Sequence, residues 1–140
     1  NFPATVLIII NINKKTMAKY VDGFVLSVPE KNIKAYQKMA QMMVKFAKKN
    51  GVLDYIEAVG DDLNPKMGGM KIMKFPQIAK TKPDETVVFS FLVFKSKAHR
   101  DSFNAKMMKE MMDDPKAKDM KMPFDMKRMA YGGFKSIVEL

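Results

Sequence analysis

The spacing of hydrophobic residues predicts an alternation of strands and helices along the chain. Two segments repeat their apolar residues every three or four positions, as helices with one buried side do: 30–50 and 97–112. Four other segments are rich in β-branched and aromatic residues, as strands are: 20–28, 52–59, 86–94 and 128–138. The predicted order is therefore strand, helix, strand, strand, helix, strand.

Residues that cap or break regular structure support these boundaries. Pro29 ends the first strand and suits the first turn of a helix, and Asn50-Gly51 provides a left-handed stop for that helix. Ser96 can cap the second helix, and Asp113-Asp114-Pro115 breaks it. Gly132-Gly133 in the last strand indicates a bulge or a close backbone approach.

The segment between the second and third strands differs in character. The stretch 63–83 contains five Pro and Gly residues and is expected to be mostly loop, with room for one short strand near Ile72–Phe75. The strand that follows it, 86–94, is apolar on both faces apart from Thr86 and Ser90, so we expect it to be central in its sheet.

This order predicts an α+β fold of the ferredoxin-like (βαββαβ) kind, with one antiparallel sheet and two helices on one face. The other face of such a sheet is left open, and an apolar open face requires a partner. A second copy of the chain related by a two-fold axis is the commonest solution, so we expect a homodimer in which two sheets pair.

The first sixteen residues read differently from the rest. The apolar run from Ala4 to Ile10 is far shorter than the ~20 residues of a membrane-spanning helix, and Lys14 and Lys15 follow it, whereas a secretory signal places its charges first. We interpret residues 1–16 as an extension, with a single domain over 17–140. The alternative is an additional edge strand, for which the β-branched residues are suited.

Composition narrows the chemistry. The chain of 140 residues has no Cys and one His, which excludes thiolate nucleophiles, cysteine-held zinc and multi-histidine metal sites, so no metal or cofactor is expected. The absence of Cys fits a reducing compartment, and we expect the protein to be cytoplasmic. The net charge of +10 suggests an anionic partner, but the excess lies on the predicted helices, so we expect solvated helix faces and no nucleic-acid ligand.

Methionine is over-represented, at 15 residues, and eight of them lie between Met107 and Met129. Because Met is flexible and fills irregular gaps, this excess predicts a helix packed loosely against a sheet or a partner. The alternative is a Met-based metal site.

Several motifs resemble a known family. They are Tyr20–Phe24 (YVDGF), Glu57–Asp62 (EAVGDD), Glu85–Asp101 (ETVVFSFLVFKSKAHRD) with Asn104, and Met122–Lys135 (MPFDMKRMAYGGFK). Together they are similar to the YbaA-like bacterial family of unknown function, from about Lys19 to Val138. The resemblance implies membership of the dimeric α+β barrel superfamily, which includes small monooxygenases, haem-degrading enzymes, lactone isomerases and stress-induced proteins. Ala58 stands where the family usually has Cys, and the loop around Met67–Met70 is longer than usual.

Asp22, Glu57 and Tyr131 are the candidate catalytic residues. Strand alternation places Asp22 and Glu57 among apolar and aromatic side chains. If those faces point into the dimer barrel, burial raises their pKa or a basic partner such as Arg100 or Arg128 lowers it, as general acid–base chemistry requires. The alternative is that each carboxylate lies at a strand end, solvated or paired.

The candidate ligand-binding residues are His99, Arg100, Asn104 and Arg128. His99 is the only side chain that ordinarily titrates near neutrality, and we expect it on the outer side of the second helix. Arg100 and Asn104 are one helical turn apart and could act together on an anionic ligand or on a partner subunit.

Three hypotheses for function therefore remain open. The protein binds or transforms a small organic molecule in a barrel pocket, it is a non-catalytic stress-associated or structural dimer, or it binds RNA weakly. An enclosed pocket lined by at least two of the polar candidates would favour the first hypothesis, and a filled barrel would favour the second.

Overall fold

The computed structural model describes residues 18–140, so the predicted extension 1–16 lies outside the described residues. Four strands form one sheet, in the order β2-β3-β1-β4, and every neighbouring pair is antiparallel. The bounds of the strands are β1 Tyr20–Pro29, β2 Asp54–Val59, β3 Glu85–Phe94 and β4 Ala130–Lys135. The predicted α+β class and the central position of 86–94 are confirmed.

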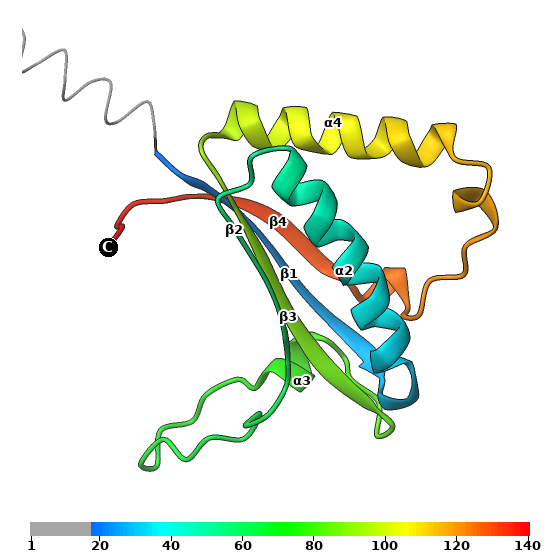
Figure 1. The fold of residues 1–140 in the computed structure, drawn as a ribbon. Coiled ribbons are helices and arrows are strands. Elements are labelled where there is room, and N and C mark those ends of the chain that lie inside the picture. Colours follow the sequence, from blue (N-terminus) through cyan, green and yellow to red (C-terminus); the bar gives the residue numbers. More distant parts are fainter. Residues whose placement is uncertain (1–17) are drawn as a thin grey trace, which may run out of the picture.

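The two long helices lie on the same side of the sheet (Figure 1). They are α2, Ile33–Lys49, preceded by the 3₁₀ turn η1 (Glu30–Asn32), and α4, Lys97–Asp113. Ser96 caps α4 as predicted, because its Oγ accepts a hydrogen bond from the backbone N–H of His99 at 3.1 Å. Two further 3₁₀ turns, η2 (Ala117–Asp119) and η3 (Met126–Arg128), connect α4 to β4.

The hydrophobic core lies between the sheet and these helices, in two neighbouring clusters. One is built around Leu26, Val28, Tyr36 and Val88. The other is built around Ala47, Leu92, Phe94 and Phe103. Even-numbered residues of β1 and β3 therefore face the helices, and odd-numbered residues face the opposite side.

The loop after β2 contains a short helix where the sequence predicted a strand. Residues 72–74 have no regular structure, and α3 spans Phe75–Ile78 on the side of the sheet opposite α2 and α4 (Figure 1). Pro76 in its first turn fits a helix start, and the Gln77 side chain accepts a hydrogen bond from the Lys74 N–H at 2.8 Å. These local bonds form a helical turn and leave the segment outside the sheet.

Candidate functional site

Asp22 lies at the centre of a polar cluster between β1, β4 and α4. Its side chain is buried, and its two carboxylate oxygens have different partners. Arg100 Nη1 donates to Oδ1 at 2.8 Å, and the Tyr131 hydroxyl donates to Oδ2 at 2.9 Å. The structure thus brings together a predicted base, a predicted phenol and a predicted cation, from three separate elements.

Gly133 provides the space for the Arg100 guanidinium. It pairs with Asp22 across the sheet, and a Cβ at this position would lie 2.7 Å from Arg100 Nη1 and would collide with the Tyr20 hydroxyl. The guanidinium carbon lies 4.7 Å from the centre of the Tyr20 ring, a cation–π distance. The close approach therefore occurs at Gly133 alone and is made by side chains, and the β1–β4 register runs through the glycine pair without a bulge.

The solvent-facing side of this cluster consists of Tyr131, Asn104 and part of Arg100. Asn104 Nδ2 and Arg100 Nη1 each donate to the Tyr131 hydroxyl at 3.2 Å. Tyr131 stacks on Phe24, with 4.7 Å between ring centres, and stays 48% exposed. Within residues 18–140, Arg100 Nη2 and Asn104 Oδ1 have no hydrogen-bond partner, so both can bind a ligand atom.

The surroundings fix the charge states of two members. Burial raises the pKa of the Tyr131 hydroxyl above its ordinary value, and the hydrogen bond to Asp22 acts in the same direction, so the phenol keeps its proton at neutral pH. Burial opposes the charge on Arg100, but Asp101 and Asp22 outweigh that effect and raise its pKa. Arg100 Nε donates to Asp101 at 2.8 Å, so two carboxylates contact this one guanidinium.

Glu57 belongs to a second cluster on the same face of the sheet. The hydroxyl of Tyr36, on α2, donates to Oε2 at 2.6 Å, and the hydroxyl of Tyr55, on β2, donates to Oε1 at 2.6 Å. Burial raises the pKa of both tyrosines, and their hydrogen bonds to Glu57 raise it further. Both phenols therefore remain protonated donors to one carboxylate.

Ser90 lies between the two clusters. It pairs with Glu57 on β2 and with Phe24 on β1, so its side chain points to the same face as theirs. Its hydroxyl is buried and is the only buried side-chain oxygen or nitrogen in residues 18–140 without a hydrogen-bond partner. Such groups ordinarily have one, in the protein or in an ordered water.

The condition that Asp22 and Glu57 lie on the open face of the sheet, toward a second subunit, is not met. Both lie on the face that α2 and α4 cover, since Arg100 of α4 binds Asp22 and Tyr36 of α2 binds Glu57. Asp22 is paired, as the alternative interpretation held. The face left uncovered by the long helices is formed by the other residues of each strand.

His99 is half-buried and holds two helix ends together, so its expected position on the outer side of α4 is wrong. Its Nδ1 accepts a hydrogen bond from the Lys95 N–H at 3.1 Å, and its Nε2 lies 2.8 Å from the Asn50 carbonyl oxygen at the end of α2. The ring also packs edge-on against Phe94. Both ring nitrogens of His99 are therefore engaged in contacts within the fold.

Arg128 lies away from the other candidates. It makes two parallel hydrogen bonds to Glu85, of 2.6 and 2.7 Å, and a third to Asp125 at 3.1 Å. Glu85 pairs with Pro29, seven residues along β1 from Asp22, which corresponds to about 23 Å of strand. Arg128 therefore anchors the segment before β4 to the start of β3, and it is the partner of neither Asp22 nor Glu57.

Sequence reasoning missed the contributions of Tyr36, Tyr55 and Tyr20 to these clusters. Tyr36 occupies one of the apolar positions in the helical spacing of 30–50, so that spacing does not reveal a partner for its hydroxyl. A buried Tyr hydroxyl usually finds a partner, and a carboxylate on the strand beneath that helix was the signal that could have found the Tyr36–Glu57 bond. No feature of the sequence pattern indicates the cation–π contact between Tyr20 and Arg100.

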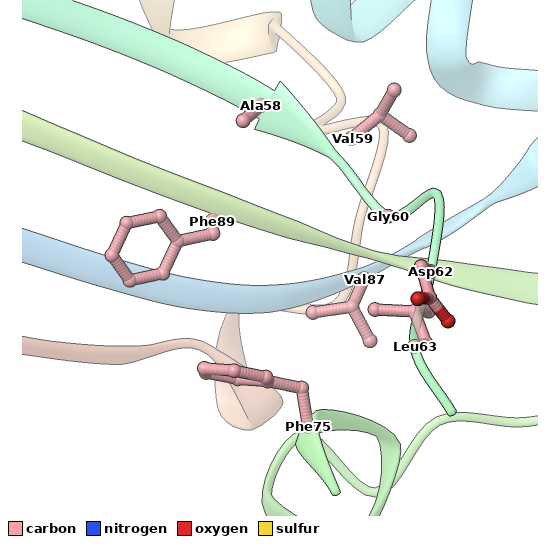
Figure 2. A pocket seen from close by; sticks show the side chains of 8 residues that line it. All are labelled: Ala58, Val59, Gly60, Asp62, Leu63, Phe75, Val87 and Phe89. Carbon is pink, nitrogen blue, oxygen red and sulfur yellow. The ribbon is translucent and has the colours of Figure 1, made fainter. Parts of the chain in front are cut away.

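An apolar hollow of about 340 Å³ lies on the opposite side of the sheet, at the α3 end (Figure 2). Phe75 of α3 and Phe89 of β3 contact each other edge-on within it. Asp62 is the one charged side chain in its wall. None of the predicted catalytic or ligand-binding residues lines this hollow.

Residues 18–140 contain neither a carboxylate or histidine cluster for a metal nor a membrane-spanning helix. No group of three or more His, Asp or Glu side chains in that range is arranged to hold a metal ion. None of the helices there is long and apolar enough to cross a membrane.

Comparison with known proteins agrees with the sequence motifs. A family model described as "Protein of unknown function (DUF1428)" matches residues 19–126. The "Uncharacterized protein YbaA" of Escherichia coli K12 is 41% identical over 123 residues, which cover 86% of this chain and 98% of the relative. The protein of the same description from Shigella flexneri matches to the same extent.

Proposed function

The chain belongs to the DUF1428 family, and from the geometry of its polar clusters we propose that it binds a small neutral organic molecule at Tyr131, Asn104 and Arg100. The observation that carries the proposal is the exposed edge of the Asp22 cluster. There a half-exposed phenol lies beside an amide oxygen and guanidinium hydrogens that have no partner in the described residues. Convergent polar groups on an apolar aromatic surface are typical of small-molecule sites.

Binding is favoured over acid–base catalysis because the two candidate bases are occupied. Both oxygens of Asp22 accept hydrogen bonds, from Arg100 and Tyr131, and both oxygens of Glu57 accept them from tyrosines. A general base needs a carboxylate oxygen that reaches the proton it removes. In this arrangement Asp22 and Glu57 hold the hydrogen-bond donors around them in place instead of accepting a proton from a substrate.

The local charge favours a neutral ligand over the anion first considered. Arg100 is paired with Asp22 and Asp101, so one positive charge faces two negative charges. These two carboxylates offset the attraction that Arg100 would exert on an anion. A carbonyl group, in contrast, can accept a hydrogen bond from Arg100 without carrying a charge, and a hydroxyl group can both accept from Arg100 and donate to Asn104 Oδ1.

Three small molecules that share a cyclohexane ring and differ in their polar group test this proposal. Cyclohexanone and cyclohexanol, with cyclohexanecarboxylate as the anionic analogue, are titrated into isotopically labelled protein and followed by NMR. The neutral probes are expected to shift the Asn104 side-chain amide and the backbone amides around Tyr131. Tyr131→Phe and Asn104→Ala are expected to weaken these shifts, while Gln41→Ala, on the exposed face of α2, leaves them unchanged. Stronger binding by the carboxylate, or shifts confined to the apolar hollow, would refute the proposal.

We further propose that the protein is a cytoplasmic homodimer with a ferredoxin-like subunit, in which the open sheet faces pair as a dimeric α+β barrel. The strand order and the two covering helices are compatible with that subunit. The open face carries large exposed apolar side chains on three strands: Ile56, Phe89 and Phe134. A contiguous apolar face of this kind marks an interaction surface. The exposed lysines of α2 lie on the other side of the molecule, which disfavours RNA on this face.

Sedimentation velocity tests the dimer. Phe134 lies over Gly23 and Gly132 and is 63% exposed, so Phe134→Lys adds a charge to the open face without disturbing the core. It is expected to convert dimer to monomer. Met112→Lys, at a residue that is 74% exposed on α4, is the matched control and should sediment like the wild type. A wild-type monomer, or equal effects of the two variants, would exclude this interface.

A further inference from the structure

Three methionines on the last two turns of α4 have no place in the core. Met107 packs against the cluster around Phe103, as the loosely packed helix predicts. Met108, Met111 and Met112 are 61%, 53% and 74% exposed. Every residue from 108 to 113 is exposed, because this half of α4 extends away from the sheet (Figure 1). The filling of gaps in the core therefore does not explain why methionine occupies these three positions.

From this arrangement we propose that Met108, Met111 and Met112 bind one soft monovalent metal ion, Cu(I) or Ag(I), through their thioether sulfurs. The site is separate from the proposed ligand site and does not depend on it. Residues three and four apart are neighbours on a helix, with about 5–6 Å between Cβ atoms. Met108 is related to both of the others by these spacings, so the three side chains lie on one face.

The length of the methionine side chain makes convergence possible. Each side chain has three rotatable bonds, the first two of which set the position of the sulfur, and at this exposure no packing holds it in another position. Three sulfurs from one helical turn can therefore reach a common point without any movement of the backbone.

The electrostatics of this turn also favour a cation. The C-terminus of a helix carries partial negative charge, and α4 ends at Asp113, so Met111 and Met112 lie in its last turn. The segment 106–114 holds three carboxylates and two lysines, which makes it locally acidic in a chain with a net charge of +10. A positive ion bound here is stabilised by both effects.

The class of metal follows from the donor atoms. Thioethers are soft, uncharged ligands that select Cu(I) over Zn²⁺, Mg²⁺ or Ca²⁺. The chain has no Cys, and both ring nitrogens of its single His are hydrogen-bonded, so no stronger soft ligand competes in residues 18–140.

Titration with Ag(I), which needs no reductant, tests the proposal on protein labelled with ¹³C at the methionine methyl groups, in chloride-free buffer. The first equivalent is expected to shift the methyl resonances of Met108, Met111 and Met112 ahead of the others. The Leu triple variant M108L/M111L/M112L keeps the side-chain size and is expected to lose this first step. Zn²⁺ is expected to shift none of the three.

A second triple variant controls for adventitious binding to exposed thioethers. Met42, Met70 and Met73 are 67%, 65% and 71% exposed but are dispersed over α2 and the loop before α3. M42L/M70L/M73L should retain the first equivalent. Parallel shifts of all exposed methionines, loss of the step in both variants, or no response to Ag(I) would overturn the proposal. Circular dichroism of both variants verifies that they are folded.

Discussion

Ser27 and Ser90 are both buried on the sheet, each 1% exposed, but only Ser27 has hydrogen-bond partners. Its hydroxyl donates to the Ala79 carbonyl at 3.0 Å and lies 2.8 Å from Thr81 Oγ1. Removing a satisfied buried hydroxyl costs about 1–2 kcal/mol, whereas removing an unsatisfied one costs little. We expect Ser27→Ala to destabilise the protein by that amount and Ser90→Ala to change the free energy of unfolding by less than about 0.5 kcal/mol.

Urea unfolding of the two variants measures this difference. If Ser90→Ala is as costly as Ser27→Ala, Ser90 has a polar partner, such as an ordered water shared with Glu57. That result would place a solvent-filled space between the two polar clusters.

Gly133 and Gly132 are adjacent in β4 but have different surroundings. A Cβ at Gly133 would meet the Tyr20 hydroxyl and Arg100, whereas a Cβ at Gly132 meets only Phe134, at 3.7 Å. Gly133→Ala is therefore expected to displace the Arg100 guanidinium and to cost about 1–3 kcal/mol, as overpacking does. Gly132→Ala is expected to have a much smaller effect. Thermal unfolding compares the stability of the two variants. Equal losses of stability would contradict the view that position 133 requires glycine because of its contacts with Tyr20 and Arg100.

Glu85 gives stability a specific pH dependence. Its hydrogen bonds with Arg128 lower its pKa to about 2, from an ordinary value of 4.5. Since the folded state holds the ionised form, this stabilisation is complete above about pH 4.5 and is lost as the pH falls toward 2. Glu85→Gln should remove that part of the acid dependence in urea unfolding at pH 6, 4 and 3. Glu110→Gln, at an exposed position of α4, should follow the wild-type profile. If its profile matches that of Glu85→Gln instead, the Glu85–Arg128 ion pair is not the cause of the acid dependence.

At the scale of elements, α4 has two unlike halves. Arg100, Phe103 and Asn104 contact the sheet or its core, whereas every residue from 108 to 113 is exposed. Local opening requires little free energy where few apolar groups are buried. We expect the backbone amides of 108–113 to exchange hydrogen faster than those of the C-terminal half of α2, which buries Ala47 against the core. Native-state hydrogen exchange measures this difference. Equal protection of the two segments would mean that the face of α4 carrying Met108, Met111 and Met112 is covered in solution.

The elements that the sequence predicted correctly are those in which local and tertiary preferences agree. In β3, apolar residues on both faces predict a central strand, which the sheet order bears out, and in α4 a capping serine precedes an apolar spacing. The stretch Ile72–Phe75 has strand-like residues, but Pro76 and the Gln77 bond to Lys74 favour a helical turn. The site was predicted in part for the same reason. Strand alternation shows which side chains share a face with Asp22 and Glu57. It does not show which of the two faces α2 and α4 cover, because that depends on the path of the connections between elements, and no local sequence pattern encodes that path.

At the scale of the whole molecule, the sheet separates two kinds of surface. The polar clusters lie beneath the helices, and the aromatic face with its hollow lies on the other side. A ligand in the first and a second subunit on the second would not compete for space. The two proposals can therefore be tested independently on the same protein.

The strand order also determines when the sheet can be assembled on the ribosome. Among the strands in residues 18–140, β1 is synthesised first, and both of its neighbours, β3 and β4, come later in the chain. At roughly 5–20 residues per second, β3 follows the end of β1 by several seconds. During that interval β1 is an apolar strand with two unpaired edges, available to chaperones or to other nascent chains. Within the described part of the chain, α2 is the one long helix already synthesised that can cover it.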